Sequence, residues 1–261
     1  MDTPWAHRIF ALIVCAVILL RTARARKGRE YHIRRIPGVD AMEESIGRAT
    51  EIGRPILFLP GILGLEMMPT IAGLSVLRWV AKRAVEMLVR LIVVIFEPST
   101  TSVVTEILRD TYRQADQAER FDEKDIVYGS NKEDAYASAI MGVIQRERVA
   151  AGFYFGGFGF ESLLVSENGF RVGAIQVAAT TDVAQIPFFI CACDYVLIGE
   201  ELYAASAYLT RDPVQVGSLS GQDFGKALVA VLILMGSVVA LWMSLSSNGP
   251  TLNPIEGILL K

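Results

Sequence analysis

The sequence predicts an α/β protein: a Rossmann-like, mostly parallel sheet of about six strands with helices on both faces, flanked by two transmembrane helices. Three observations predict this. Short β-rich apolar runs alternate with amphipathic stretches of helix length between residues 52 and 212. An uncharged apolar run lies on either side of that region. The chain is also 52% hydrophobic with a mean hydropathy of +0.40, above the ~45–50% of ordinary soluble domains.

The two apolar runs differ in length. The run at 227–245, "ALVAVLILMGSVVALWMSL", carries no charge, and at about 1.5 Å per residue it can cross a hydrocarbon core of ~30 Å. The run at 9–20, "IFALIVCAVILL", is shorter and lies between Arg8 and Arg21. It spans only if these arginines extend toward the interface. We expect transmembrane helices over 5–22 and 227–245.

Basic residues follow the N-terminal run instead of preceding it, which argues against a cleaved signal peptide. They are Arg21, Arg24, Arg26, Lys27, Arg29, Arg34 and Arg35. Because basic loops stay on the cytoplasmic side, the main domain is expected in the cytoplasm, with both termini outside a bacterial inner (plasma) membrane. We expect the first five of these side chains at the lipid interface, with membrane lipid as a partner.

The remaining segments divide as follows. Residues 23–51 are expected to form a basic juxtamembrane linker, a turn at Pro37 and Gly38, and a short helix. Residues 52–212 form the cytoplasmic Rossmann-like domain, and 213–226 a connector before the second span. Residues 246–261 make a short outside tail. A net charge of −3 with the bases gathered near the membrane leaves the rest acidic, so no nucleic-acid partner is expected.

Six strand and helix units are expected in the domain. The strands are predicted at 55–61, 91–98, 125–130, 150–157, 173–180 and 194–199, each followed by a helix. This alternation is typical of a parallel sheet covered on both faces. Ser130 and Glu133 have the spacing of a capping box that opens the third helix.

Ligands of open α/β sheets bind at the carboxyl ends of the strands. The candidate ligand-binding residues there are Glu97, Ser99, Ser130, Gly156, Gly157, Gly159, Ser162, Asp182 and Glu200. Serine and aspartate are also the residue types preferred at helix N-caps, so capping is the simpler role for several of them. No catalytic residue is assigned, and an enzymatic role is not favoured.

The stretch "GGFGFES" at 156–162 is the most specific candidate. Backbone N–H groups of such a loop and a helix N-terminus can surround an anion. However, the stretch contains no lysine or arginine, and Phe158 and Phe160 would crowd a phosphate. A tight packing turn is the alternative. The loop after the first strand, "PGILGLE", matches neither a dinucleotide nor a triphosphate motif, so no cofactor is expected.

Histidine occurs only at His7 and His32, outside the domain. Catalysis that needs histidine within the domain, and histidine-based metal sites, are therefore excluded, and no metal is expected. The cysteines are Cys15, Cys191 and Cys193. We interpret them as small buried hydrophobic residues, with 191–193 on an extended segment.

Several runs resemble an uncharacterised family of bacterial membrane proteins that is known only as a domain of unknown function. They are "GRPILFLPG", "TIAGLSVL", "GAIQVAATTDVAQIPFFICACDYVLIGEELYAASAYL" and "GSLSGQDFGKAL", within residues 34–235. The resemblance implies a membrane-anchored α/β domain and carries no activity or ligand.

These observations favour a membrane-anchored, non-enzymatic scaffold or assembly protein that forms homo-oligomers or binds partner proteins. Small and aromatic residues at 203–208 suit close packing with a partner, and Gly236 with Ala240 forms a small-xxx-small pair. One alternative is a sensor of a small ligand or nucleotide, or a degenerate enzyme, that uses the strand-end loops. Another is an accessory subunit of a larger membrane complex, with other subunits as partners.

Overall fold

The computed structural model describes residues 5–27, 36–210 and 212–245. The chain forms two compact units. One comprises residues 34–210 and holds the sheet, and the other comprises residues 1–33 with 211–261. Arg29, Arg34 and Arg35 of the basic segment, and the expected tail at 246–261, lie outside the described residues.

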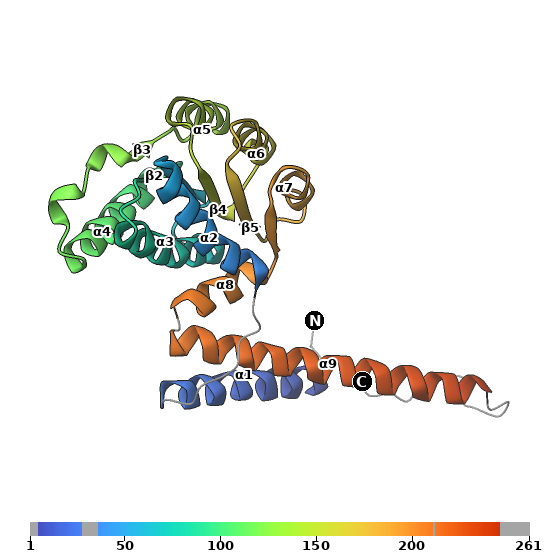
Figure 1. Ribbon diagram of the computed structural model, residues 1–261. Helices are drawn as coiled ribbons and strands as arrows, with labels where there is room; N and C mark the ends of the chain where they lie inside the picture. The colour runs from blue at the N-terminus through green and yellow to red at the C-terminus, as the bar shows by residue number, and fades with distance from the viewer. Residues whose placement is uncertain (1–4, 28–35, 211, 246–261) are drawn as a thin grey trace. The chain divides into compact units, whose positions relative to one another are not determined.

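The first unit contains one sheet of six parallel strands in the order β3-β2-β1-β4-β5-β6 (Figure 1). The strands are β1 (Ile56–Gly61), β2 (Leu91–Ile95), β3 (Ile126–Tyr128), β4 (Ala151–Gly157), β5 (Ile175–Thr180) and β6 (Tyr195–Ile198). All six predicted strands are confirmed, and the sheet is wholly parallel. The order is that of the doubly wound dinucleotide-binding fold.

Helices connect the strands. They are α2 (Pro37–Ile52), α3 (Met68–Glu86), α4 (Pro98–Gln114), α5 (Glu133–Glu147), α6 (Glu161–Arg171), α7 (Ile186–Ala192) and α8 (Glu201–Thr210). Two short 3-10 turns, Ala118–Arg120 and Glu123–Asp125, precede β3. Parallel neighbours need such crossovers because the chain must return to the same end of the sheet.

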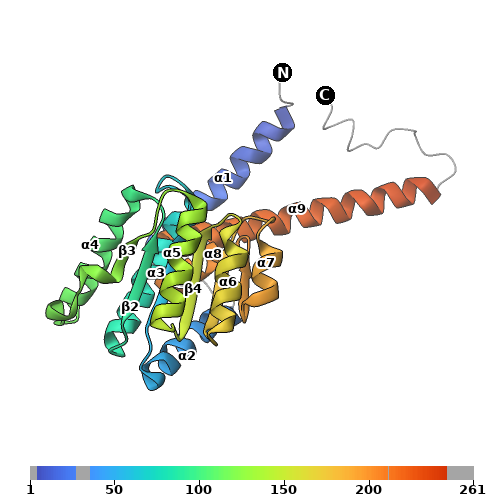
Figure 2. The same ribbon diagram turned by 90° about the horizontal axis from the view of Figure 1, so that it is seen from above.

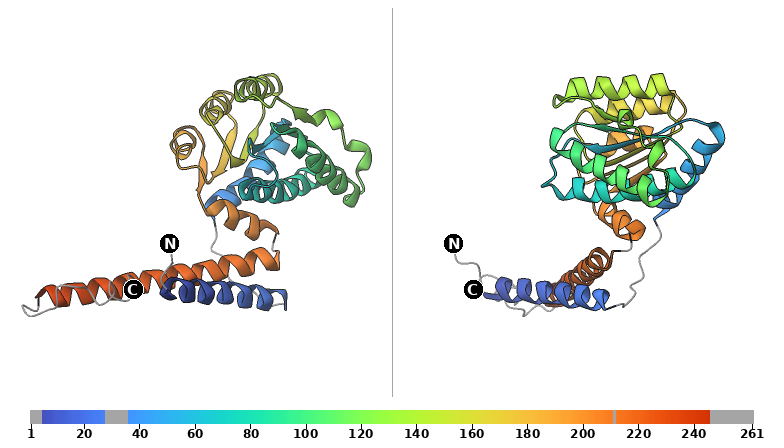
Figure 3. Two further views of the ribbon diagram at one scale, coloured as in Figure 1. Left: turned by 180° about the vertical axis from the view of Figure 1, so that it is seen from behind. Right: turned by 90° about the vertical axis from the view of Figure 1, so that its left-hand side faces the viewer.

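Alternate strand side chains build two hydrophobic cores. Phe58, Val93 and Phe153 point toward the layer of α2, α3, α4 and α8. Leu57, Val94 and Tyr154 point toward the layer of α5, α6 and α7. Figures 1 and 3 show these helix layers on opposite faces of the sheet. Because both faces are covered, strand residues are buried without alternating polarity.

Two expected local features are wrong. Pro37 and Gly38 do not form a turn, because Pro37 is the first residue of α2, where its missing N–H costs nothing. Ser130 does not open a capping box either. Its Oγ accepts from Lys132 N at 3.1 Å, and α5 begins only at Glu133. The Glu133 side chain therefore does not take part in a capping box and approaches Gly159 instead.

The second unit is a pair of helices, α1 (Trp5–Arg26) and α9 (Pro213–Leu245). The expected connector at 213–226 is the first part of α9. Gly217, Gly221 and Gly225 of α9 face Thr22, Ile18 and Val14 of α1 in turn, so the helices are antiparallel. A Cβ on Gly217 or Gly221 would lie 2.6 or 2.8 Å from the α1 backbone. Glycine is therefore required for this approach, as in small-xxx-small helix contacts.

Among the described residues, one helix is long and apolar enough to cross a membrane. It is Pro213–Trp242 of α9, within which an 18-residue stretch has a mean hydropathy of 2.3, and it covers most of the predicted C-terminal span. The other predicted span lies within α1, a helix of 22 residues.

Candidate functional site at the carboxyl ends of β1 and β4

The direction of strand order reverses between β1 and β4, since the chain proceeds from β1 to β2 and β3 on one side and returns to β4 on the other. In this fold, ligands bind where the loops after two such strands separate. The loop after β4 carries the glycine-rich stretch and leads into α6. Figure 2 shows α5, α6 and α7 side by side over the face of the sheet next to this loop.

The carboxyl ends of β1 and β4 stay in contact instead of separating, with Gly61 paired to Gly157. Ile62 N donates to Gly157 O at 2.9 Å. Gly61 has a φ of +87°, and a Cβ on it would contact Gly157 O. A Cβ on Gly157 would contact the Leu63 side chain, and one on Gly156 would contact Pro60 O. These glycines therefore allow the chain to approach itself closely, and Leu63 lies where a ligand would approach Gly157.

Glu161 occupies the place of an anion in this loop. It is the first residue of α6 and is fully buried, and its Oε1 accepts from Gly159 N at 2.9 Å. A helix N-terminus favours a negative charge, which here comes from the chain itself. A phosphate would meet both a used N–H donor and a buried carboxylate of like charge. The structure thus favours the packing-turn interpretation of "GGFGFES" over the phosphate interpretation.

A second carboxylate approaches the same point. Glu133 Oε2 and Glu161 Oε2 each lie 2.9 Å from the position that a Cβ on Gly159 would take. Glu133 is half-buried, whereas Glu161 Oε2 is buried and has no hydrogen-bond partner among the described residues. Burial raises the pKa of Glu161 and the Glu133 charge adds to this, while hydrogen bonds from backbone N–H groups oppose it.

Tyr136 closes the inner side of this region. Its ring is fully buried and its hydroxyl donates to Val94 O at 3.2 Å. Burial raises the pKa of this phenol, and the Glu161 charge contributes. Tyr136 is therefore a neutral donor committed to the β2 backbone.

The other sequence-predicted residues of this edge serve local structure. Ser162 Oγ lies 2.9 Å from Gly159 O and 2.8 Å from Gln185 Oε1. Asp182 Oδ1 accepts from Ala184 N at 2.9 Å, which closes a turn before α7. Of the predicted ligand residues, Gly159 contacts the Glu161 side chain, and Ser162 follows Glu161 in the chain.

Besides Ser130, whose Oγ accepts from Lys132 N, three predicted residues remain. Glu97 precedes α4, where its side chain makes no cap hydrogen bond, and Ser99 is exposed in the first turn. The neighbouring Thr100 is buried, and its Oγ1 has no partner among the described residues. Glu200 is exposed and precedes α8.

The basic residues expected at the membrane interface have different environments. Arg21 Nη1 donates to Ser220 O at 3.0 Å and lies 2.6 Å from Ser220 Oγ. Its guanidinium also lies 5.1 Å from the centre of the Phe224 ring. Arg24, Arg26 and Lys27 are exposed. Arg21 thus links α1 to α9, and an apolar groove of about 500 Å³ runs beside this contact, lined by Val14, Ile18, Lys226 and neighbours on α9.

The segment around α7 presents an uncharged face. Phe189 points inward and packs on Tyr154 and Phe158. Phe188, Ile190 and Cys191 are exposed, Ile190 to 55%, and Val183 before the helix is exposed to 79%. No charged residue occurs between Asp182 and Asp194. We call Val183, Phe188, Ile190 and Cys191 the α7 face.

The α7 face corrects the interpretation of the cysteines. Cys191 is exposed on a helix and does not lie in an extended segment, and Cys15 of α1 is also exposed. Only Cys193 is partly buried, and its burial raises the pKa of its thiol. The period-2 spacing at 191–193 was misleading because a seven-residue helix ends at Ala192.

Sequence reasoning missed Glu133 and Glu161 as a pair. Glu161 was visible at the start of the helix, but Glu133 was assigned to a cap that does not form. The signal available in the sequence was the position of both glutamates in the first turns of helices that follow consecutive strands of the chain, β3 and β4. Their approach to Gly159 depends on how α5 and α6 pack together.

The chain matches the family described as "Domain of unknown function (DUF6754)" over residues 3–249. It therefore belongs to that family, and the expected membership of an uncharacterised family is confirmed. No curated protein and no solved structure matches the chain.

Proposed function

We propose that this chain is a membrane-anchored, non-enzymatic scaffold whose Rossmann-like domain forms homo-oligomers through the α7 face. The observation that carries the proposal is the exposure of Val183, Phe188 and Ile190 within an uncharged segment. Exposed apolar patches with polar borders mark interaction surfaces.

A second copy of the chain is the partner that best fits the α7 face. A two-fold contact places the same surface against itself, so charged residues there would repel one another. The segment that carries the α7 face avoids this, because residues 183–193 are uncharged and Asp182 and Asp194 flank them in the chain. Depletion of charge at the centre with a polar rim is the usual composition of interfaces.

This location replaces the one expected at residues 203–208. Ala205 and Ala207 are buried in the core and α8 packs on α3, so these small residues serve the fold. We assign membrane anchoring to α9. The helix α1 packs antiparallel to α9 and is the second membrane span. The bases that follow the apolar run of α1 support a cytoplasmic location of the domain at a bacterial inner membrane.

The close contact between the ends of β1 and β4 supports a non-enzymatic role. Glu161 holds the N-terminus of α6, and Leu63 lies against Gly157. The side chains of Glu161 and Leu63 would both have to move before a nucleotide could bind here as it does at other switch points.

Native mass measurement of the full chain in mild detergent tests the proposal. The wild type is expected as a homo-oligomer, and Ile190→Glu as a monomer, because a buried unpaired charge is costly at an interface. Val103→Glu is the matched control, since Val103 is an exposed apolar residue on α4. A monomeric wild type, or equal behaviour of the two variants, contradicts the proposal. Recovery with unrelated chains in place of copies would indicate the accessory-subunit role.

A further inference from the structure

Two carboxylate oxygens converge on Gly159. A Cβ on this residue would lie 2.9 Å from Glu133 Oε2, 2.9 Å from Glu161 Oε2 and 3.3 Å from Ile62 Cδ1. Because a side chain would collide with both carboxylates, only a glycine allows them to pack this closely on the backbone. The two acidic oxygens therefore approach one point, between the first turns of α5 and α6.

One of these oxygens lacks a partner that its burial demands. Glu161 is fully buried, and its Oε2 makes no hydrogen bond with the described residues. A buried anionic oxygen is costly unless a proton or a positive charge satisfies it. An ion pair does not do so here, because none of the described ion pairs contains Glu161 or Glu133.

Two neighbouring carboxylates favour a divalent cation as the missing positive charge, since one proton would neutralise only one of them. Oε1 of Glu161 accepts the Gly159 N–H, so Oε2 is the atom that lacks a partner. Glu133 and Glu161 lie in the first turns of α5 and α6, so one ion can reach both.

We propose that Glu133 and Glu161 bind a hard divalent cation of the magnesium or calcium class through their Oε2 atoms, next to Gly159. Oxygen-only ligation suits these ions, and one or two carboxylates with several waters is a common way to hold Mg²⁺. Water and the ion reach the site past Glu133, which is half-buried. The ion joins α5 to α6 and thereby stabilises the switch-point loops. This inference is independent of the α7 face.

Thermal unfolding of the full chain in mild detergent tests the site after treatment with a chelator. Addition of MgCl₂ or CaCl₂ is expected to raise the Tm in a saturable way, in contrast to NaCl of equal ionic strength, because a ligand of the native state stabilises it. Calorimetric titration with the same salts is expected to give one site per chain.

Two variants and a matched control locate the ion. Glu133→Gln and Gly159→Ala are expected to weaken cation binding by about tenfold or more, the first by removing a charged ligand and the second by displacing both carboxylates. Asp134→Asn removes the same charge from the same helix turn but is exposed beside the site, so it is expected to keep the Tm shift.

Three results would overturn the proposal. One is a wild type whose Tm ignores divalent cations. Another is a Glu133→Gln protein that keeps the full shift. The third is a wild type stabilised by mild acid alone and indifferent to divalent cations, which would assign a shared proton to the pair.

Discussion

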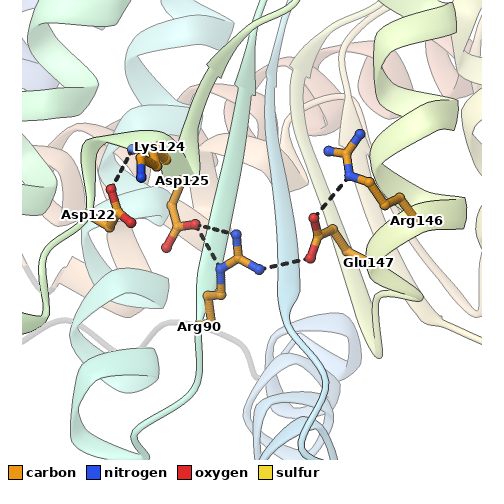
Figure 4. Close-up of polar contacts among 6 residues, drawn as sticks. All are labelled: Arg90, Asp122, Lys124, Asp125, Arg146 and Glu147. Carbon is orange, nitrogen blue, oxygen red and sulfur yellow. Dashed lines mark hydrogen bonds and ion pairs between the residues drawn. The ribbon is translucent and has the colours of Figure 1, made fainter.

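Arg90 and Glu147 are joined at the amino ends of the strands, with Arg90 Nη1 2.8 Å from Glu147 Oε2 (Figure 4). Arg90 precedes β2 and Glu147 is the last residue of α5. The same guanidinium donates from Nε to Asp125 Oδ1 at 2.8 Å, just before β3. This contact ties three crossovers together at the edge of the sheet opposite Glu161, where it serves the fold.

The Arg90 network predicts a dependence of stability on pH. Hydrogen bonds from Arg146 and then Arg90 hold the pKa of Glu147 below its ordinary value of 4.5. A depressed carboxyl pKa stabilises the native state above the ordinary value, and this contribution is lost as the pH falls through the folded-state pKa. Arg90 is half exposed, so Arg90→Met should cost less than about 1 kcal/mol at neutral pH.

Urea unfolding of the two proteins at several pH values measures this difference. We expect the difference between the wild type and Arg90→Met to shrink as the pH falls below 4.5 and through the lowered pKa of Glu147. The control is Arg171→Met, which removes an exposed pair with Glu167 within one helix and should change little. A difference that persists in acid would show that Arg90 acts by packing instead.

The buried hydrogen bond between Tyr154 and Gln176 gives a second prediction. Tyr154 Oη donates to Gln176 Oε1 at 2.8 Å, and the Gln176 amide donates to Ser166 O and Ala192 O, each at 2.9 Å. Tyr154→Phe leaves a buried acceptor without this donor and should destabilise the protein by about 1–3 kcal/mol. Equilibrium unfolding in urea measures the loss.

Tyr128→Phe is the control for that variant, since Tyr128 is exposed on the edge strand β3. It should lie within about 0.5 kcal/mol of the wild type. Equal losses in both variants would mean that the Gln176 network contributes nothing specific.

Close packing of α1 on α9 gives a third prediction. A Cβ on Gly221 would lie 2.8 Å from the Ile18 Cα, so Gly221→Val must separate the two helices. Backbone amides of residues 14–22 should then exchange hydrogen faster, because local opening becomes easier. Hydrogen exchange of the full chain in mild detergent detects this change.

Ala240→Val is the matched change on the same helix at an exposed position. It should leave the exchange of α1 unaltered. Unchanged exchange in Gly221→Val would contradict the antiparallel contact.

The sheet could be predicted because its signal is local. Runs such as 91–98 are short, β-rich and apolar throughout, as expected of strands covered on both faces. Boundaries were less certain where polar residues admit two roles. Ser130 and Glu133 have capping-box spacing, yet Ser130 closes a turn and Glu133 turns toward Gly159. Residue spacing alone does not distinguish a helix N-cap from a turn that lies just before the helix.

The candidate site was predicted only in its location. Strand-end loops follow from the parallel α/β pattern, and the glycines at 156, 157 and 159 were found in them. The sequence does not show which residues these glycines contact, because Pro60, Leu63 and Glu133 belong to other parts of the chain. The same holds for Cys191, whose exposure depends on which side of α7 faces Tyr154.

The sequence by itself determined the α/β class, the six strands and the apolar C-terminal helix, because periodicity and apolar length are properties of contiguous residues. Three contacts were decided only by the tertiary structure. Glu161 occupies the anion position of its own loop, and Glu133 approaches it beside Gly159. Gly217 and Gly221 allow α1 to pack closely on α9. Each of these contacts joins residues from different elements, and its existence depends on side-chain packing between helices that no local pattern encodes.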